Sequence, residues 1–338
     1  MADGASRGQG ADDSGGMSER RTTRIEIGLA AAIVTVRDNE PLVLLTPPGR
    51  AELCALPSGA FDAVKHRTFE IGLREWVKEQ TGLNLGYAEQ LYTFGDRGRH
   101  AQAGDAGPHV VSVGYLALTG IPRISGRVEF LPWYRFLPWE DWRGGRPRMI
   151  DDILVPALER WARQKAPEQE ASDRRGLSRQ ERLKLCFGGE NTPFDEEKAL
   201  ERYELLYEAG LVMEAIRDGR ADPAATMGPG FGMAMAFDHR RILATAIGRL
   251  RGKLKYRPVI FELIPSEFTL TSLQHTVEAI SGRHLHKQNF RRLVETSQLV
   301  EPTGGKTTTG GRPAALFRFR REVMAERPAP GIRVGSRG

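Results

Sequence analysis

The sequence is poor in the features that mark secreted, membrane-spanning and cysteine-stapled proteins. Its 338 residues include two cysteines, Cys54 and Cys186, which are too few for a disulfide framework or a cysteine metal site. No apolar run reaches the roughly 18 residues of a membrane span. The N-terminal segment MADGASRGQGADDSGG has no apolar stretch after a basic start, so we expect no secretory signal. These absences favour a protein of the reducing cytoplasm with no membrane partner.

The first two thirds of the chain lack a net positive charge, whereas the last third is strongly basic. The net charge of +6 hides this asymmetry. Residues 239–338 contain 19 Lys and Arg against 7 Asp and Glu, whereas residues 1–238 contain 30 against 36. A basic segment joined to an acidic remainder predicts a polyanionic partner for the C-terminal part. A solvated basic tail is the alternative.

The composition predicts more than one folded unit. Apolar content of 40% and charged content of 27% are typical of globular proteins, and the length exceeds one ordinary core. Polar and Gly/Pro-rich stretches at 165–176 and 219–232 separate the parts. We predict a disordered tail (1–22), an α/β domain (23–164), a linker with a helical insert (165–237), a second domain (238–322) and a disordered tail (323–338).

Apolar runs around one amphipathic helix predict an α/β unit in the N-terminal part. The run IEIGLAAAIVTV is typical of a buried strand. A turn at Asp38-Asn39 joins it to PLVLLT in a predicted hairpin. Apolar residues recur at helical spacing over about 67–80, and Gly82 follows as a C-cap glycine. Two further strand-like runs, NLGYAEQLYTFG and HVVSVGYLAL, complete the unit.

Helical patterns dominate the rest of the chain. In the insert, two helices are predicted over 178–187 and 195–216. In the C-terminal part, Asp238 is expected to cap a helix that begins at His239. Thr271 is expected to cap a second helix, which is closed by Gly282. A third helix over about 286–296 is followed by LVEPT, a glycine-rich loop and AALFRFR, which predict a β-hairpin.

Two helices joined by a short Gly-containing turn and followed by a basic hairpin form a winged helix-turn-helix. The second helix of this motif enters the major groove by its N-terminal residues. Amide side chains there can pair with base edges, and guanidiniums can bond guanine or phosphate. Glycines in the wing let the backbone approach the DNA, and Arg312 can reach into a narrow minor groove. The predicted DNA-binding residues are Lys287, Gln288, Asn289, Arg291, Arg292, Lys306 and Arg312.

A winged helix used only for protein contacts would show a similar solvated basic face. Here helical spacing, a glycine-rich wing and the local charge excess coincide, so DNA binding is the favoured interpretation. Helix-turn-helix proteins of this kind bind palindromic sites as symmetric dimers. We therefore expect a homodimer on double-stranded operator DNA.

The N-terminal part resembles the Nudix family at LPSG (Leu56 to Gly59) and at LREWVKEQTGL (Leu73 to Leu83). In the Nudix box, carboxylates at helical spacing hold divalent cations against a diphosphate, so that a metal-bound water can attack. The resemblance implies a Nudix-like α/β/α sandwich. With the helical insert and the winged helix-turn-helix, the predicted fold class is α+β.

The Nudix box is degenerate in this sequence. Gly59 and Gly82 are 23 positions apart, two more than the box allows. Anchored on Thr81-Gly82, the four carboxylate positions hold Arg67, Trp76, Glu79 and Gln80. Anchored on Arg74-Glu75, they hold His66, Glu75, Lys78 and Glu79. Either register loses too many oxygen ligands for two cations, so we expect no metal site, no catalytic residues and no hydrolysis.

A nucleotide diphosphate can still be bound by such a domain. The segment from Tyr92 to Arg99 offers aromatic surface, glycine-exposed backbone and two guanidiniums for phosphate. The predicted nucleotide-binding residues are Phe94, Arg97, Arg99 and Glu79. An ordinary polar loop after a strand is the alternative for this segment.

The whole chain resembles the NrtR-type regulators of NAD metabolism. The resemblance covers roughly 24–321 and is most specific at QLYTFGDRGR, DHRRILATAIGRLRGKLKY and FELIPSEFTLTSLQ. The large insert is more similar to the alphaproteobacterial branch called NadQ. The resemblance implies a transcriptional repressor of NAD biosynthesis genes that senses an adenine nucleotide (ADP-ribose, NAD or ATP) and requires no cofactor. An active Nudix hydrolase of ADP-ribose- or NAD-type diphosphates is the alternative.

Overall fold

The computed structural model describes most of the chain. The described residues are 24–47, 53–96, 99, 109–120, 127–164, 176–189, 192–222, 231–308, 313–326 and 331–332. Within these ranges no helix combines the length and the apolar character needed to cross a membrane.

A mixed sheet forms the centre of the N-terminal part, in the order β4-β5-β1-β2-β6, with β3 paired to β1. Strand β1 runs parallel to β5 and antiparallel to β2. The predicted hairpin turn is confirmed, because Asp38 and Asn39 both have positive φ, as the tight turns that match strand twist require. The strands are β1 (Ile25–Arg37), β2 (Glu40–Leu45), β3 (Ser58–Ala60), β4 (Tyr87–Phe94), β5 (His109–Leu118) and β6 (Glu129–Pro132).

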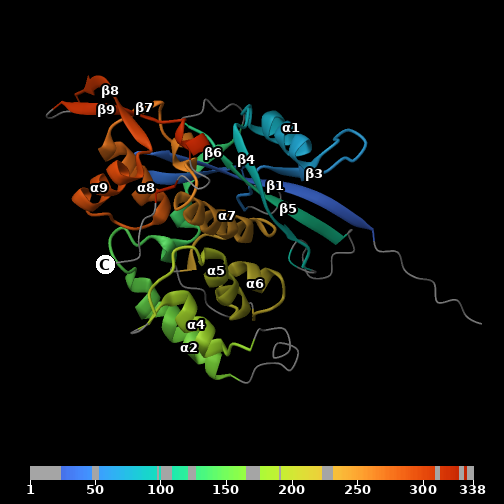
Figure 1. Cartoon of the computed structure of the whole chain (residues 1–338). Coiled ribbons are helices and arrows are strands. Elements are labelled where there is room, and N and C mark those ends of the chain that lie inside the picture. Colours follow the sequence, from blue (N-terminus) through green and yellow to red (C-terminus); the bar gives the residue numbers. More distant parts are fainter. Residues whose placement is uncertain are drawn as a thin grey trace, which may run out of the picture.

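Both faces of this sheet are covered by helices. Side chains of β1 alternate, so that Leu29 and Ile33 belong to one buried cluster and Ala30 and Val34 to the other. Helix α1 (Phe69–Thr81) covers the first face, and helix α7 (His239–Leu254) covers the second (Figure 1). The predicted C-cap of α1 is confirmed by the left-handed Gly82.

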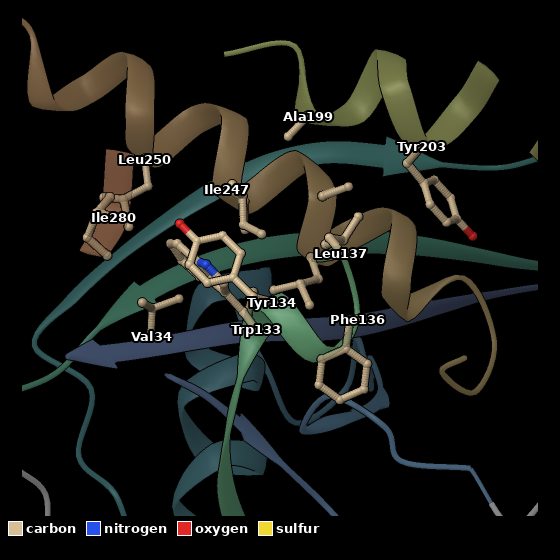
Figure 2. Packing of buried hydrophobic residues seen from close by; sticks show 14 of the residues in the cluster. Val34, Trp133, Tyr134, Phe136, Leu137, Ala199, Tyr203, Ile247, Leu250 and Ile280 are labelled. Carbon is tan, nitrogen blue, oxygen red and sulfur yellow. The ribbon is translucent and has the colours of Figure 1, made fainter. Parts of the chain in front are cut away.

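Helix α7 is buried on almost every side. Figure 2 shows its Ile247 and Leu250 pointing toward Val34 of β1 and the Trp133–Tyr134 pair. On its other side α7 meets the start of the insert helix α5 (Ala199–Glu208), where a Cβ at Gly248 would lie 2.5 Å from the Glu197 carbonyl oxygen. Asp238 occupies the predicted N-cap position, but its side chain makes no capping hydrogen bond.

The insert consists of short helices packed beside α7. Helix α4 (Arg179–Phe187) begins at a capping box formed by Ser178 and Glu181. The single helix predicted over 195–216 is wrong: the structure has α5 and then α6 (Met213–Arg217), separated by a left-handed Gly210. The segment before the insert contains η1 (Trp133–Arg135), η2 (Pro138–Glu140), η3 (Ile150–Leu154) and α2 (Val155–Arg163).

The C-terminal part is a winged helix. Its first helix, α8 (Leu270–Ser281), starts two residues earlier than expected, because Thr269 rather than Thr271 is the N-cap and pairs with Ser272 in a capping box. The predicted closure at Gly282 is confirmed. The other elements are η5 (Val259–Glu262), β7 (Glu267–Phe268), α9 (Lys287–Ser297), β8 (Val300–Thr307), β9 (Ala314–Phe319) and α10 (Val323–Glu326). Strands β7, β9 and β8 form the small sheet.

A fully buried carboxylate joins the three parts. Glu140 of η2 binds Arg202 of α5 (Nε–Oε1 2.5 Å) and Arg251 of α7 (Nη1–Oε2 2.5 Å), and all three side chains are 0% exposed. Burial alone would raise the pKa of Glu140, but the two guanidiniums more than offset it and hold the pKa below its usual range. Arg251 also donates to the Ile280 carbonyl at the end of α8.

The α+β architecture predicted from the sequence is therefore confirmed. The domain limits remain a prediction, because α7, placed at the start of the second domain, packs against the sheet of the first.

Candidate functional site

A pocket of about 200 Å³ opens where the sheet meets the start of α7. One wall is the backbone of β3, which carries the LPSG motif at its start. The residues lining the pocket are Glu26, Ile27, Gly28, Leu29, Ala30, Ser58, Gly59, Ala60, Val110, Ser112, Phe237 and His239. Apolar walls with a few polar groups are usual for small-molecule sites, so this is the candidate ligand site.

The face of α1 that meets β3 holds no carboxylates for a metal. Trp76 donates from Nε1 to the Ala60 carbonyl (2.9 Å) and lies so close to Gly59 that no Cβ would fit there. The Gln80 amide accepts from Ser58 N (3.2 Å) and donates to Ser58 O (2.7 Å). Two of the box positions counted from Thr81-Gly82 thus fasten α1 to the pocket wall. In the part of the chain described, no three His, Cys, Asp or Glu side chains gather into a metal site.

The predicted nucleotide-binding residues that the structure describes, Phe94, Arg99 and Glu79, do not line this pocket. Phe94 is 6% exposed in the core beneath α7, with the Arg241 guanidinium 5.0 Å from its ring centroid. Arg99 forms two hydrogen bonds with Glu204 of α5 (2.9 and 2.8 Å) and stacks on Tyr207. Glu79 is exposed on α1 and does not line the pocket, and Arg97 falls outside the described residues. Their roles remain predictions, and phosphate at Arg99 would have to compete with Glu204.

Two pocket residues were missed by sequence reasoning. Phe237 and His239 flank the start of α7, and their rings meet edge to face with centroids 5.3 Å apart. The Nδ1 atom of His239 accepts a hydrogen bond from Leu56 N at 3.0 Å, so α7 is tied directly to the LPSG segment. The sequence signal was the string FDH at the start of a helix, which we interpreted only as a cap.

Charged side chains gather at the first turn of α7. Arg241 pairs with Asp238 (Nη1–Oδ2 3.1 Å), with Glu204 of α5 and with Asp96 after β4. Burial raises the pKa of Asp238 to about 6, because the lowering by Arg241 and Arg99 does not fully offset it. The pKa of Asp96 behaves differently: burial would raise it, but Arg241 holds it below its usual value.

The predicted recognition helix presents its polar residues to solvent. In α9 Phe290 and Val294 are buried against the rest of the winged helix. Lys287, Gln288 and Asn289 at the N-terminus of α9 are exposed together with Arg291 and Arg292. Neither arginine forms an ion pair with another described residue, whereas Arg283, before the helix, is held by Glu196 (3.1 Å).

The wing continues this basic surface. Lys306 is exposed near the end of β8. It follows two glycines, of which Gly304 has a φ of 82°. Arg312, the other predicted wing residue, falls outside the described residues.

The C-terminal segment matches a known family. Residues 260–319 match the model of the NrtR DNA-binding winged helix domain. This segment is therefore similar to the winged helix domains of NrtR proteins. The ADPR responsive transcriptional repressor NtrR of Acinetobacter baylyi is 44% identical over 85 residues, which make up 25% of this chain and 34% of that protein. The match therefore spans about a third of the relative's length.

The NrtR likeness extends to the whole architecture. The crystal structure of Shewanella oneidensis NrtR complexed with a 27mer DNA has a TM-score of 0.53 at 21% identity, covering 91% of this chain and 98% of that one. A second crystal structure of Shewanella oneidensis NrtR has a TM-score of 0.50 at 22% identity, covering 88% of this chain and 94% of that one. The NrtR-type fold, a Nudix-like domain joined to a winged helix, is thus confirmed. The NadQ branch remains a prediction.

The raised pKa of Asp238 predicts how pH changes the stability of the protein. An unfolded aspartate has a pKa near 3.9, so the folded protein binds more protons between about pH 4 and pH 6, and the free energy of unfolding falls as the pH rises through this window. Between about pH 4 and pH 6, the free energy of unfolding of the parent should fall by on the order of 2 kcal/mol relative to that of Asp238→Asn.

Urea denaturation followed by tryptophan fluorescence, at pH steps from about 4 to 8, measures the difference between parent and variant. The matched control is Asp62→Asn, because the pKa of the exposed Asp62 is lowered by hydrogen bonds from Val64 and Lys65. Because Asp238 is present in both proteins, the parent and this control should decline together, and the difference between them should show no fall over the same window. Parallel profiles for the parent and Asp238→Asn would contradict the assignment.

Proposed function

We propose that this protein is a transcriptional repressor of NAD biosynthesis genes that releases its operator when a nucleotide occupies the Nudix-like domain. The observation that carries the proposal is the exposed basic surface of α9, whose arginines form no ion pair with another described residue, on a segment that matches the NrtR winged helix domain. Phosphate contacts from such side chains supply most of the affinity for DNA, and base-edge contacts supply the sequence preference.

The proposed effector is an adenine nucleotide, with ADP-ribose first and NAD and ATP as alternatives. The name of the Acinetobacter relative, an ADPR responsive repressor, supports this order. The pocket beside LPSG supports the location. Trp76 and Gln80 bind the backbone of β3 where a Nudix box has carboxylates. Because these residues do not fit a pair of cations, we propose that the nucleotide is bound without a metal and is not hydrolysed.

Helix α7 connects the pocket directly to the winged helix. Its first residue, His239, lines the pocket, and Arg251 in its last turn binds both Glu140 and the carbonyl end of α8. A ligand shifts a two-state equilibrium only if it binds one state more tightly. We infer that nucleotide favours an arrangement of α7 and α8 that fits operator DNA poorly.

Operator binding is proposed to require a homodimer. Two winged helices related by a twofold axis would place two α9 helices on half-sites about one helical turn, or a multiple of it, apart. The proposed action on chromosomal DNA would take place in the cytoplasm.

The first prediction separates a sensor from a hydrolase. Incubated with ADP-ribose and Mg²⁺ or Mn²⁺, the protein should unfold at a higher temperature, because the ligand binds the folded state alone. Chromatography of the mixture should return the ADP-ribose intact. Metal-dependent hydrolysis that disappears in Glu79→Gln would instead establish a Nudix hydrolase.

The second prediction concerns the DNA-reading surface. On a palindromic fragment selected by the protein from genomic DNA, Arg291→Ala, Arg292→Ala and Arg312→Ala should each weaken binding. A lost phosphate contact should reduce the salt dependence of the affinity by about one unit of log–log slope, and a lost base contact should alter sequence preference, typically at a cost of about 1–3 kcal/mol.

The matched control is Lys184→Ala, which removes one exposed positive charge from the insert helix α4. Fluorescence anisotropy at several salt concentrations measures all four variants. If the three arginine variants bind DNA as Lys184→Ala does, the DNA-binding surface does not lie on α9 and the wing.

A further inference from the structure

Phe237 adopts a backbone conformation that aromatic residues rarely take. Its φ is +52°, in the left-handed region. Other described non-glycine residues with positive φ are Asp38 and Asn39 in a tight hairpin turn and Gln298 at the C-cap of α9. A bulky side chain in this region persists only where its surroundings hold it, and such positions cluster at ligand sites.

The insert helix α6 holds this residue in place. Arg217 of α6 donates to the Phe237 carbonyl (2.7 Å) and to the Met235 carbonyl (3.1 Å). Glu214, one turn earlier, accepts from Met235 N at 3.0 Å. Arg217 is itself oriented by Asp218 (3.0 Å). Helix α6 therefore fixes the chain that leads into α7 (Figure 1).

Phe237 is one of the residues that line the pocket. It remains 43% exposed while its edge meets His239. His239 is 2% exposed and anchored to Leu56, so the ring packs against a fixed neighbour while Arg217 holds the backbone of Phe237. A fixed aromatic ring with part of its surface in a pocket suits stacking against a planar aromatic group. Phe94, which the sequence favoured for this role, is covered by α7.

We propose that Phe237 is the base-stacking residue of the pocket and that Arg217 of the insert is the positioning residue that aims it. The inference rests on the proposed function in requiring a nucleotide in this pocket. It assigns to the insert a part in ligand recognition. Without the hydrogen bond from Arg217 of α6, the backbone of Phe237 would no longer hold the ring in the pocket.

The experiment is a double-mutant cycle on the full-length protein with ADP-ribose as the probe, measured by calorimetry. Phe237→Asn removes the ring, and asparagine tolerates the left-handed backbone better than most residues, so the variant should fold. Loss of stacking should weaken ADP-ribose binding by about 5- to 150-fold. Phe237→Trp should retain binding and show quenching of the new indole when ADP-ribose binds.

Arg217→Met tests positioning. It should weaken ADP-ribose binding in the parent and have little further effect in Phe237→Asn, because two residues that act through one contact are not additive. The matched control is Arg182→Met, which breaks an ion pair of the same insert with Glu208 (2.6 Å) and should leave ADP-ribose binding unchanged.

Unchanged ADP-ribose affinity in Phe237→Asn would overturn the stacking role. Additive losses in the double variant, or an equal loss in Arg182→Met, would overturn the positioning role. A parent that binds neither ADP-ribose nor NAD nor ATP would instead remove the proposed function, and this inference with it.

Discussion

The structure depends on the buried carboxylate of Glu140. Two guanidiniums, from Arg202 in the insert and Arg251 in α7, converge on it without access to water. A charge in such a place is tolerated only when it is paired and hydrogen-bonded, and removing one partner of a buried pair typically costs about 3–5 kcal/mol. Because the three residues come from three parts of the chain, this single network fixes how the sheet, the insert and α7 sit together. The end of α8 is bonded to the same Arg251.

Helix α7 is consequently both a layer of the Nudix-like domain and the helix that supports the winged helix. Its start forms part of the pocket through His239, and its last turn carries Arg251. Arg241, which follows His239 in the first turn of α7, forms ion pairs with Asp238 and with Glu204 of α5, so that the insert is bound to this end of the helix as well. Side chains packed this closely move as units rather than deform, so a shift at the pocket can be carried along the helix. The insert takes part at both ends, through Arg202 and Arg217.

Local patterns predicted the elements well but not the contacts between distant ones. The turn at Asp38-Asn39, the cap at Gly82 and the solvent-facing side of α9 follow from short-range rules of backbone geometry and helical spacing, and all three agree with the structure. The position of Phe94 beneath α7 and the pairing of Arg99 with Glu204 depend on residues more than a hundred positions away. No local pattern contains that information. The FDH string indicates a pocket wall only once the packing of α7 against the sheet is known.

Linkage between nucleotide and DNA tests the account most directly. The affinity for a selected palindromic operator fragment should be measured with and without saturating ADP-ribose, and the affinity for ADP-ribose with and without that fragment. Coupling through α7 predicts that each ligand weakens the other by the same factor, of about 5- to 150-fold. If ADP-ribose binds the free protein while the operator affinity stays the same, the pocket and the reader are independent and the account is contradicted.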